Sequence, residues 1–227
     1  MLITLVFIAT TFLAYLTFGL EWQRVFGINL HRVLELLDLR KENTLATWFS
    51  SIVFLVVGVG FLLLGWGTAS NFTISHLNQG IFRLATIGAI LLSADEVASV
   101  HETAGKWFGR FAAKVLTSLP VDDKGFSWVI LFAPIALLGL IIVIFVLYKI
   151  IINMPTITDW ECYAAYIALS TAFVCLPGVF ILELFEWQSH SLKIGITILS
   201  CFEEAFEMLG MYSLFFTTTL IARQYEL

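Results

Sequence analysis

The sequence alternates between long apolar segments and short polar connections. An apolar run of roughly 20 residues is long enough to cross the core of a bilayer as a helix. Six such runs occur, at about residues 2–20, 44–66, 81–102, 127–148, 162–186 and 194–222. The pattern predicts an all-α fold, a polytopic transmembrane helical bundle of six spans that forms a single integral membrane domain over residues 1–227.

Two of the connections are themselves patterned. Residues 28–42 mix Leu and Val with charged side chains, and Lys106, Arg110 and Lys114 recur at four-residue intervals after the third run. This spacing is typical of amphipathic helices that lie on a membrane surface. We therefore expect one interfacial helix after the first span and another after the third.

The composition supports a membrane protein. The chain is 59% hydrophobic and only 13% charged, and its mean hydropathy is +0.93, outside the range of soluble domains. The three cysteines lie in apolar segments, without the pairing of a disulfide framework or a zinc site. The basic residues are scattered, which argues against nucleic acid as a partner. The expected partners are membrane lipids and, as further options, a second copy of the chain or a larger membrane complex.

The distribution of basic residues predicts an orientation. The connections that follow the first, third and fifth spans hold nine of the 12 Lys and Arg residues. Basic loops face the cytoplasm in most membrane proteins. We expect the chain to lie in the inner or plasma membrane with both termini outside and the basic loops in the cytoplasm.

Three of the predicted spans carry ionisable side chains. A charge inside a bilayer is costly unless it is paired, protonated or bound to a cation, so these groups are the candidate site. Because successive spans run in opposite directions, all three clusters fall in the same half of the membrane. They are Asp95, Glu96, His101 and Glu102 on the third span, Glu183, Glu186 and His190 on the fifth, and Glu203, Glu204 and Glu207 on the sixth.

The chemistry of these side chains predicts a metal site. Carboxylates with imidazole are ligands of divalent iron, manganese and zinc, and Arg83, at the opposite end of the third span, is the single basic residue within these spans. The leading hypothesis is a cluster that binds one or two such ions near the cytoplasmic side. Its central ligands would be Asp95, Glu102, Glu203 and Glu207, completed by Glu96, His101, Glu183, Glu186 and Glu204.

Whether this cluster is catalytic is open at this point. A catalytic metal would suit water or oxygen chemistry on a lipid-soluble substrate. The Glu-x-x-His repeat of the ferritin-like carboxylate proteins is absent, and no other family resemblance is identified.

Two other functions explain the same acids. They can form the proton or cation pathway of a channel or transporter. They can also belong to a non-catalytic subunit of a membrane complex, where they are protonated or paired with basic residues of a partner. Glu186 and His190 can equally lie in the lipid headgroup layer.

Overall fold

The structure is a computed structural model that describes residues 45–67, 75–100, 103–105, 107–108, 127–154, 158–189 and 196–226. Five helices account for nearly all of this part of the chain. They are α4 (Leu45–Trp66), α5 (His76–Ala98), α7 (Ser127–Ile152), α8 (Asp159–Ser189) and α9 (Ile196–Gln224).

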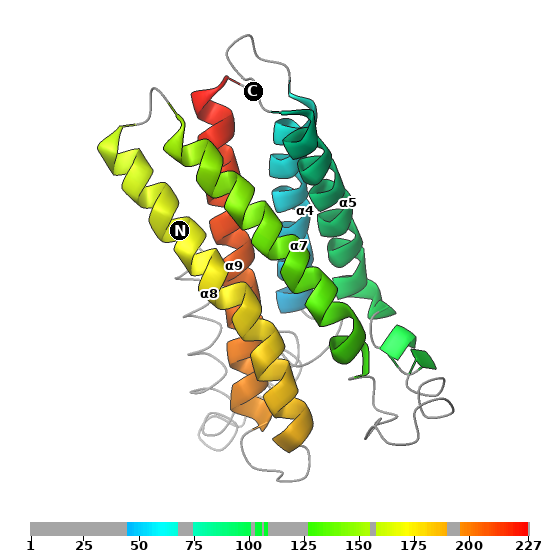
Figure 1. Cartoon of the computed structure of the whole chain (residues 1–227). Coiled ribbons are helices and arrows are strands. Elements are labelled where there is room, and N and C mark those ends of the chain that lie inside the picture. The colour runs from blue at the N-terminus through cyan, green and yellow to red at the C-terminus, as the bar shows by residue number, and fades with distance from the viewer. Residues whose placement is uncertain are drawn as a thin grey trace.

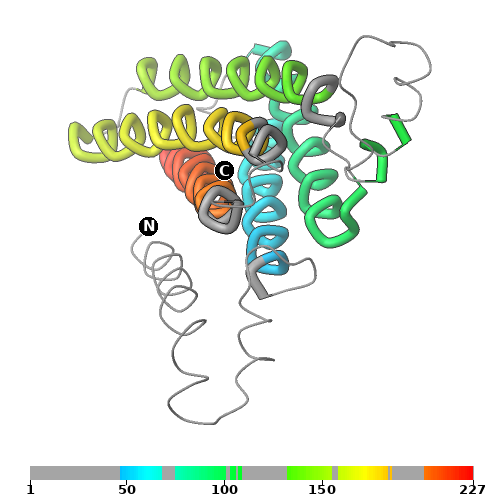
Figure 2. The backbone as a smooth tube through the Cα atoms, turned by 90° about the horizontal axis from the view of Figure 1, so that it is seen from below, coloured from blue at the N-terminus to red at the C-terminus, as the bar shows by residue number. Residues whose placement is uncertain are grey.

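The five helices form a bundle built from two antiparallel hairpins (Figures 1 and 2). Helices α4 and α5 form one hairpin and α8 and α9 form the other. Helix α9 packs against both α4 and α8, and so joins the hairpins, whereas α7 lies against α8. Consequently α4 and α9 begin, and α5 and α8 end, at one end of the bundle, the lower end in Figure 1.

Four of these helices are long and apolar enough to cross a membrane. The qualifying segments are Thr47–Trp66, Phe132–Ile152, Asp159–Glu183 and Phe202–Gln224. Helix α5 is of similar length but has polar side chains near both ends and does not qualify. The predicted span at 2–20 and the predicted surface helix at 28–42 lie outside the described residues, as does most of the one expected after the third span.

Helix α5 differs most from its predicted bounds. It begins at His76 because the hydroxyl of Ser75 accepts a hydrogen bond from the backbone N–H of Asn78, an N-cap that a search for apolar residues overlooks. It ends at Ala98, four residues before the predicted end. Ser99 has the left-handed backbone conformation (φ 48°, ψ 43°) of a helix C-cap, and its N–H bonds the carbonyl oxygen of Asp95 at 2.6 Å.

The start of α8 is fixed by reciprocal capping. The carboxylate of Glu161 accepts hydrogen bonds from the backbone N–H and the hydroxyl of Thr158, and that hydroxyl accepts one from the N–H of Glu161. Gln224, at the end of α9, also donates to this carboxylate at 3.0 Å. The beginning of α8 is thereby tied to the end of α9.

Two glycines let α9 approach its neighbours closely. A Cβ atom at Gly60 of α4 would collide with the side chain of Thr218 on α9. A Cβ at Gly210 of α9 would lie 2.6 Å from Cγ of Leu176 on α8. Small residues such as these let the backbones of neighbouring membrane helices approach closely. These contacts set the register of α9 against both of its neighbours.

We expect Gly60→Ala to destabilise the bundle by about 1–3 kcal/mol, because the added methyl group must displace Thr218 or separate α4 from α9. Gly139→Ala is the matched control, since a Cβ at Gly139 meets no atom within 4 Å. The control should be neutral or stabilising, by up to about 1 kcal/mol, because alanine is the better helix former. Thermal unfolding in detergent measures both, and equal stability of the two variants would contradict the close contact.

Candidate functional site

The site begins with Glu207 of α9. Residues Met211, Leu214, Thr218 and Ile221 follow it at alternating four- and three-residue intervals, and all four are buried. Glu207 therefore lies on the same side of α9, at one end of this buried stripe. Its Oε1 atom accepts a hydrogen bond from the hydroxyl of Ser50 on α4 at 3.3 Å, and Ser50 is only 1% exposed.

Two further carboxylates lie within electrostatic range of Glu207. Glu183 of α8 and Asp95 of α5 both interact with it electrostatically. Glu183 is 7% exposed, and Asp95 is half-buried. Three acids from three different helices therefore lie toward the same end of the bundle, where α4 contributes a hydroxyl.

A pair of serines positions Asp95. Ser51 of α4 and Ser93 of α5 each donate a hydrogen bond to the other's carbonyl oxygen, at 2.8 and 2.9 Å, and their hydroxyl oxygens are 3.0 Å apart. Both serines are buried. Because Ser51 follows Ser50 and Ser93 precedes Asp95 by two residues, this pair fixes the height of Asp95 relative to Glu207.

Of the other predicted ligands, three are described by the structure and the remainder lie wholly or partly outside the described residues. Glu96, Glu203 and Glu204 lie near the same end of the bundle and are half-buried. Glu186 lies in α8, but its side chain is outside the described part of the structure. His101, Glu102 and His190 are also outside the described residues. The expectation that Asp95 and Glu102 share one helix face assumed a continuous helix, whereas α5 ends between them.

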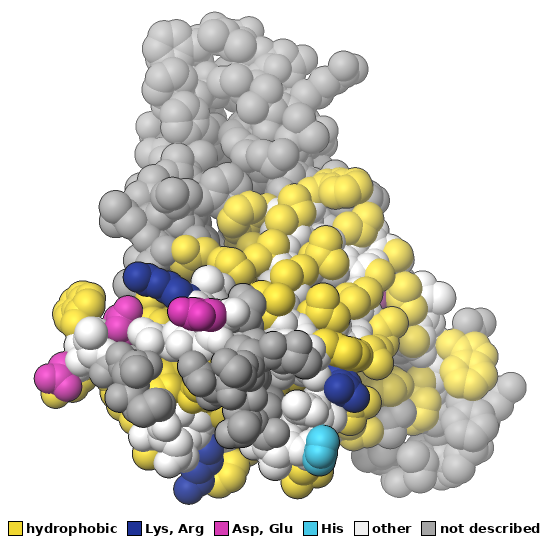
Figure 3. Space-filling model, turned by 90° about the horizontal axis from the view of Figure 1, so that it is seen from above, with side chains coloured by type: hydrophobic (Ala, Val, Ile, Leu, Met, Phe, Trp, Pro, Cys, Tyr) yellow, Lys and Arg dark blue, Asp and Glu magenta, His cyan; other side chains and the backbone are white. Residues whose placement is uncertain are grey.

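The three basic residues that the structure describes lie toward the other end of the bundle. Arg83 donates from Nε to the carbonyl oxygen of Gly65 at 2.9 Å and lies 5.0 Å from the ring centroid of Trp66. Lys149 and Arg223 are in the last turns of α7 and α9. Figure 3 views this end, where basic and acidic side chains surround the tips of the helices and the flank is hydrophobic.

The described residues alone do not form a metal site. Among them, no group of three or more His, Cys, Asp and Glu side chains has a suitable arrangement. The donors that the structure does describe here are carboxylate oxygens and one hydroxyl, which suit a hard divalent cation. The imidazole proposed for the ligand set belongs to His101, beyond the described residues.

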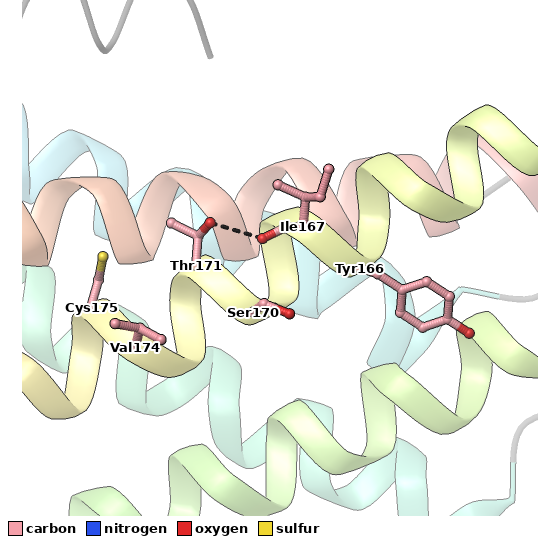
Figure 4. A pocket seen from close by; sticks show the side chains of 6 residues that line it. All are labelled: Tyr166, Ile167, Ser170, Thr171, Val174 and Cys175. Carbon is pink, nitrogen blue, oxygen red and sulfur yellow. Dashed lines mark hydrogen bonds between the residues drawn. The ribbon is translucent and has the colours of Figure 1, made fainter.

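A shallow hollow in the described surface lies on α8, away from Glu183. It has a volume of about 480 Å³ and is lined by Tyr166, Ile167, Ser170, Thr171, Val174 and Cys175, all of α8 (Figure 4). The hydroxyl of Thr171 donates to the carbonyl oxygen of Ile167 in its own helix. Glu183 follows the buried Leu176 by seven residues and so faces the bundle, whereas Val174 in the hollow is exposed.

Sequence reasoning missed the three serines. It considered ionisable side chains alone and passed over Ser50, Ser51 and Ser93 as ordinary helix residues. Their signal was nevertheless present, because hydroxyls interrupt two apolar segments at the end where the acids gather. Hydroxyls at such positions commonly bond across to a neighbouring helix.

Apolar helices, closely packed and with charged groups near their ends, indicate a helical membrane protein. The comparison with known families identifies the group to which it belongs. A family model described as "Domain of unknown function (DUF8692)" matches residues 2–222, and the chain belongs to this family. No curated protein and no solved structure matches the chain.

We expect Ser93→Ala to destabilise the protein by about 0.5–1.5 kcal/mol, because it removes one of the interhelical hydrogen bonds that join α4 and α5. Ser170→Ala removes a hydroxyl from the exposed side of α8 and should have little effect. Denaturation of both variants in the same detergent tests this. Equal stability would mean that the serine pair does not hold the two helices together.

Proposed function

We propose that this protein is an integral membrane protein of six spans that binds one or two divalent metal ions in a carboxylate centre at one end of its bundle. The observation that carries the proposal is that Glu183 and Asp95, from two other helices, lie within electrostatic range of Glu207, to which Ser50 donates a hydrogen bond. The two remaining spans of the proposed six are α5 and residues 2–20.

The physical reason is the cost of gathering like charges. Carboxylates that lie close together in a low-dielectric surrounding cannot all remain ionised unless a positive species is near them. A divalent cation neutralises two carboxylates at once and bonds directly to their oxygens. One ion shared between the acids at the polar end of α5 and the buried Glu183 would lower the electrostatic cost of keeping these carboxylates ionised.

The proposed ligand set combines described and undescribed residues. Asp95, Glu183 and Glu207 would supply oxygen donors from the described helices, and Glu96, Glu203 and Glu204, toward the same end of the bundle, would be further ligands. His101, Glu102 and the side chain of Glu186 would complete it. A site of oxygen donors alone favours manganese, whereas imidazole ligation favours iron or zinc.

We propose a lipid-soluble molecule as the substrate if the centre is catalytic. The bound metal would supply activation of water or oxygen. The chain's own contribution is to hold the acids in place through Ser50 and through the packing of α9. By the positive-inside rule this end of the bundle would face the cytoplasm.

The metal content of the purified, detergent-solubilised chain tests the proposal. Wild-type protein should retain about one or two divalent ions per chain after gel filtration, and Glu207→Gln should lose them because an amide cannot replace the anionic ligand. Glu161→Gln is the matched control, since it makes the same change at the opposite end of the bundle. Elemental analysis of the three proteins identifies the metal as well.

Two results would overturn the metal site. One is wild-type protein that stays free of metal after expression in medium supplemented with iron, manganese and zinc. The other is Glu207→Gln that retains as much metal as Glu161→Gln. Metal-free protein that moves protons or cations across liposomes would support the transport alternative, and metal-free protein that copurifies in a stoichiometric complex would support the role of a non-catalytic subunit.

A further inference from the structure

The acids lie at different distances from the ends of their helices. Asp95 and Glu96 are three and two residues before the end of α5 at Ala98, within about 5 Å of it at 1.5 Å per residue. Glu183 is six residues before the end of α8 at Ser189, about 9 Å, and Glu207 follows the start of α9 at Ile196 by 11 residues, about 17 Å. Asp95 and Glu96 are therefore the acids of this group nearest to a helix end.

Exposed tryptophans indicate where the membrane interfaces lie along α4. Trp48 and Trp66 on the outer side of α4 are 54% and 49% exposed, and they are five helical turns apart, about 27 Å. Tryptophan concentrates at the two interfaces of a membrane, and the hydrocarbon core between them is about 30 Å thick. Trp48 is therefore a marker for the interface beside Ser50, and Trp66 for the opposite interface.

An apolar layer of the described helices lies between the acids and the opposite end of the bundle. We call it the apolar seal, and it is defined by the large apolar side chains of α4, α5 and α9 that lie beyond Met208 toward that end and are at most 4% exposed. In the seal, the rings of Phe61 and Phe82 stack at 6.1 Å. Its members are Val57, Phe61, Leu64, Phe82, Leu214 and Ile221.

Four buried hydroxyls at the depth of the seal donate hydrogen bonds within their own helices. Thr86 donates to the carbonyl oxygen of Phe82, and Thr217 donates to that of Ser213. Ser213 and Thr218 likewise donate to carbonyl oxygens of α9. Each of these four hydroxyl protons is used within its own helix, as is common in membrane helices.

We propose that the carboxylate centre opens to water at one face of the membrane only, and that the apolar seal separates it from the other face. A cation then enters and leaves by the same side. One-sided exchange of a cation rests on the proposed function, because it requires a cation site. One-sided access of water to the carboxylates does not depend on whether a metal binds. It makes the centre a one-sided binding site rather than a segment of a conducting path.

Cysteine accessibility in sealed vesicles tests the placement. Cys162, Cys175 and Cys201 are first replaced by alanine, and single cysteines are then introduced by Asp95→Cys, Glu96→Cys, Leu214→Cys and Glu226→Cys. A membrane-impermeant maleimide is applied to right-side-out and to inverted vesicles. We expect Asp95→Cys and Glu96→Cys to react in one orientation only, Glu226→Cys in the opposite orientation only, and Leu214→Cys in neither.

A flux measurement with the unmodified chain completes the test. In proteoliposomes with an imposed pH gradient, or loaded with Mn²⁺, the wild-type protein should give no flux above that of empty vesicles. Reaction of Asp95→Cys or Glu96→Cys from both sides, reaction of Leu214→Cys, or flux that Glu207→Gln abolishes would each overturn the proposal. Metal-free protein with the expected labelling would overturn the metal site alone.

Discussion

The close packing of α9 between α4 and α8 is the constraint on which the rest of the structure depends. Gly60 and Gly210 remove the side-chain bulk that would hold these helices apart, and their neighbours Thr218 and Leu176 fill the space. The same register brings Ser50 of α4 within hydrogen-bond distance of Glu207. Stability and the arrangement of the acids therefore share one cause, and a change that loosens α9 disturbs both.

The distribution of charge along the bundle follows from the cost of desolvation. Arg83, Lys149 and Arg223, the basic residues that the structure describes, lie toward one end, and the acids of the candidate site lie at the other. Between them the helices meet through apolar contacts and through hydroxyls satisfied by backbone carbonyls. Each carboxylate that the structure describes in the candidate site thus lies within about three helical turns of a helix end.

The sequence predicted the helical bundle and the common end of the acids, because both depend on local patterns and on the alternation of helix direction. Apolar length alone located α4 and α7 to within a few residues. The end of α5 was less predictable, since it depends on the conformation of Ser99 rather than on hydropathy. The sequence also could not predict which carboxylates lie within electrostatic range of Glu207. That outcome depends on the helix register set by Gly60, Gly210 and the Ser51–Ser93 pair, and the roles of the predicted ligands in binding a cation stay predictions.

Pro177 has a consequence for the part of α8 that carries Glu183. Proline has no backbone N–H, so the carbonyl oxygen of Phe173 receives no hydrogen bond from the residue four positions later. Helix α8 nevertheless continues through this position to Ser189. The last three turns of α8 are therefore joined to the remainder by a weakened hydrogen-bond ladder, and they can tilt as a unit. A tilt of these turns would change the separation of Glu183 from Glu207 while α4, α5 and α9 stay in place, so the width of the proposed carboxylate centre would depend on the geometry of α8 at Pro177.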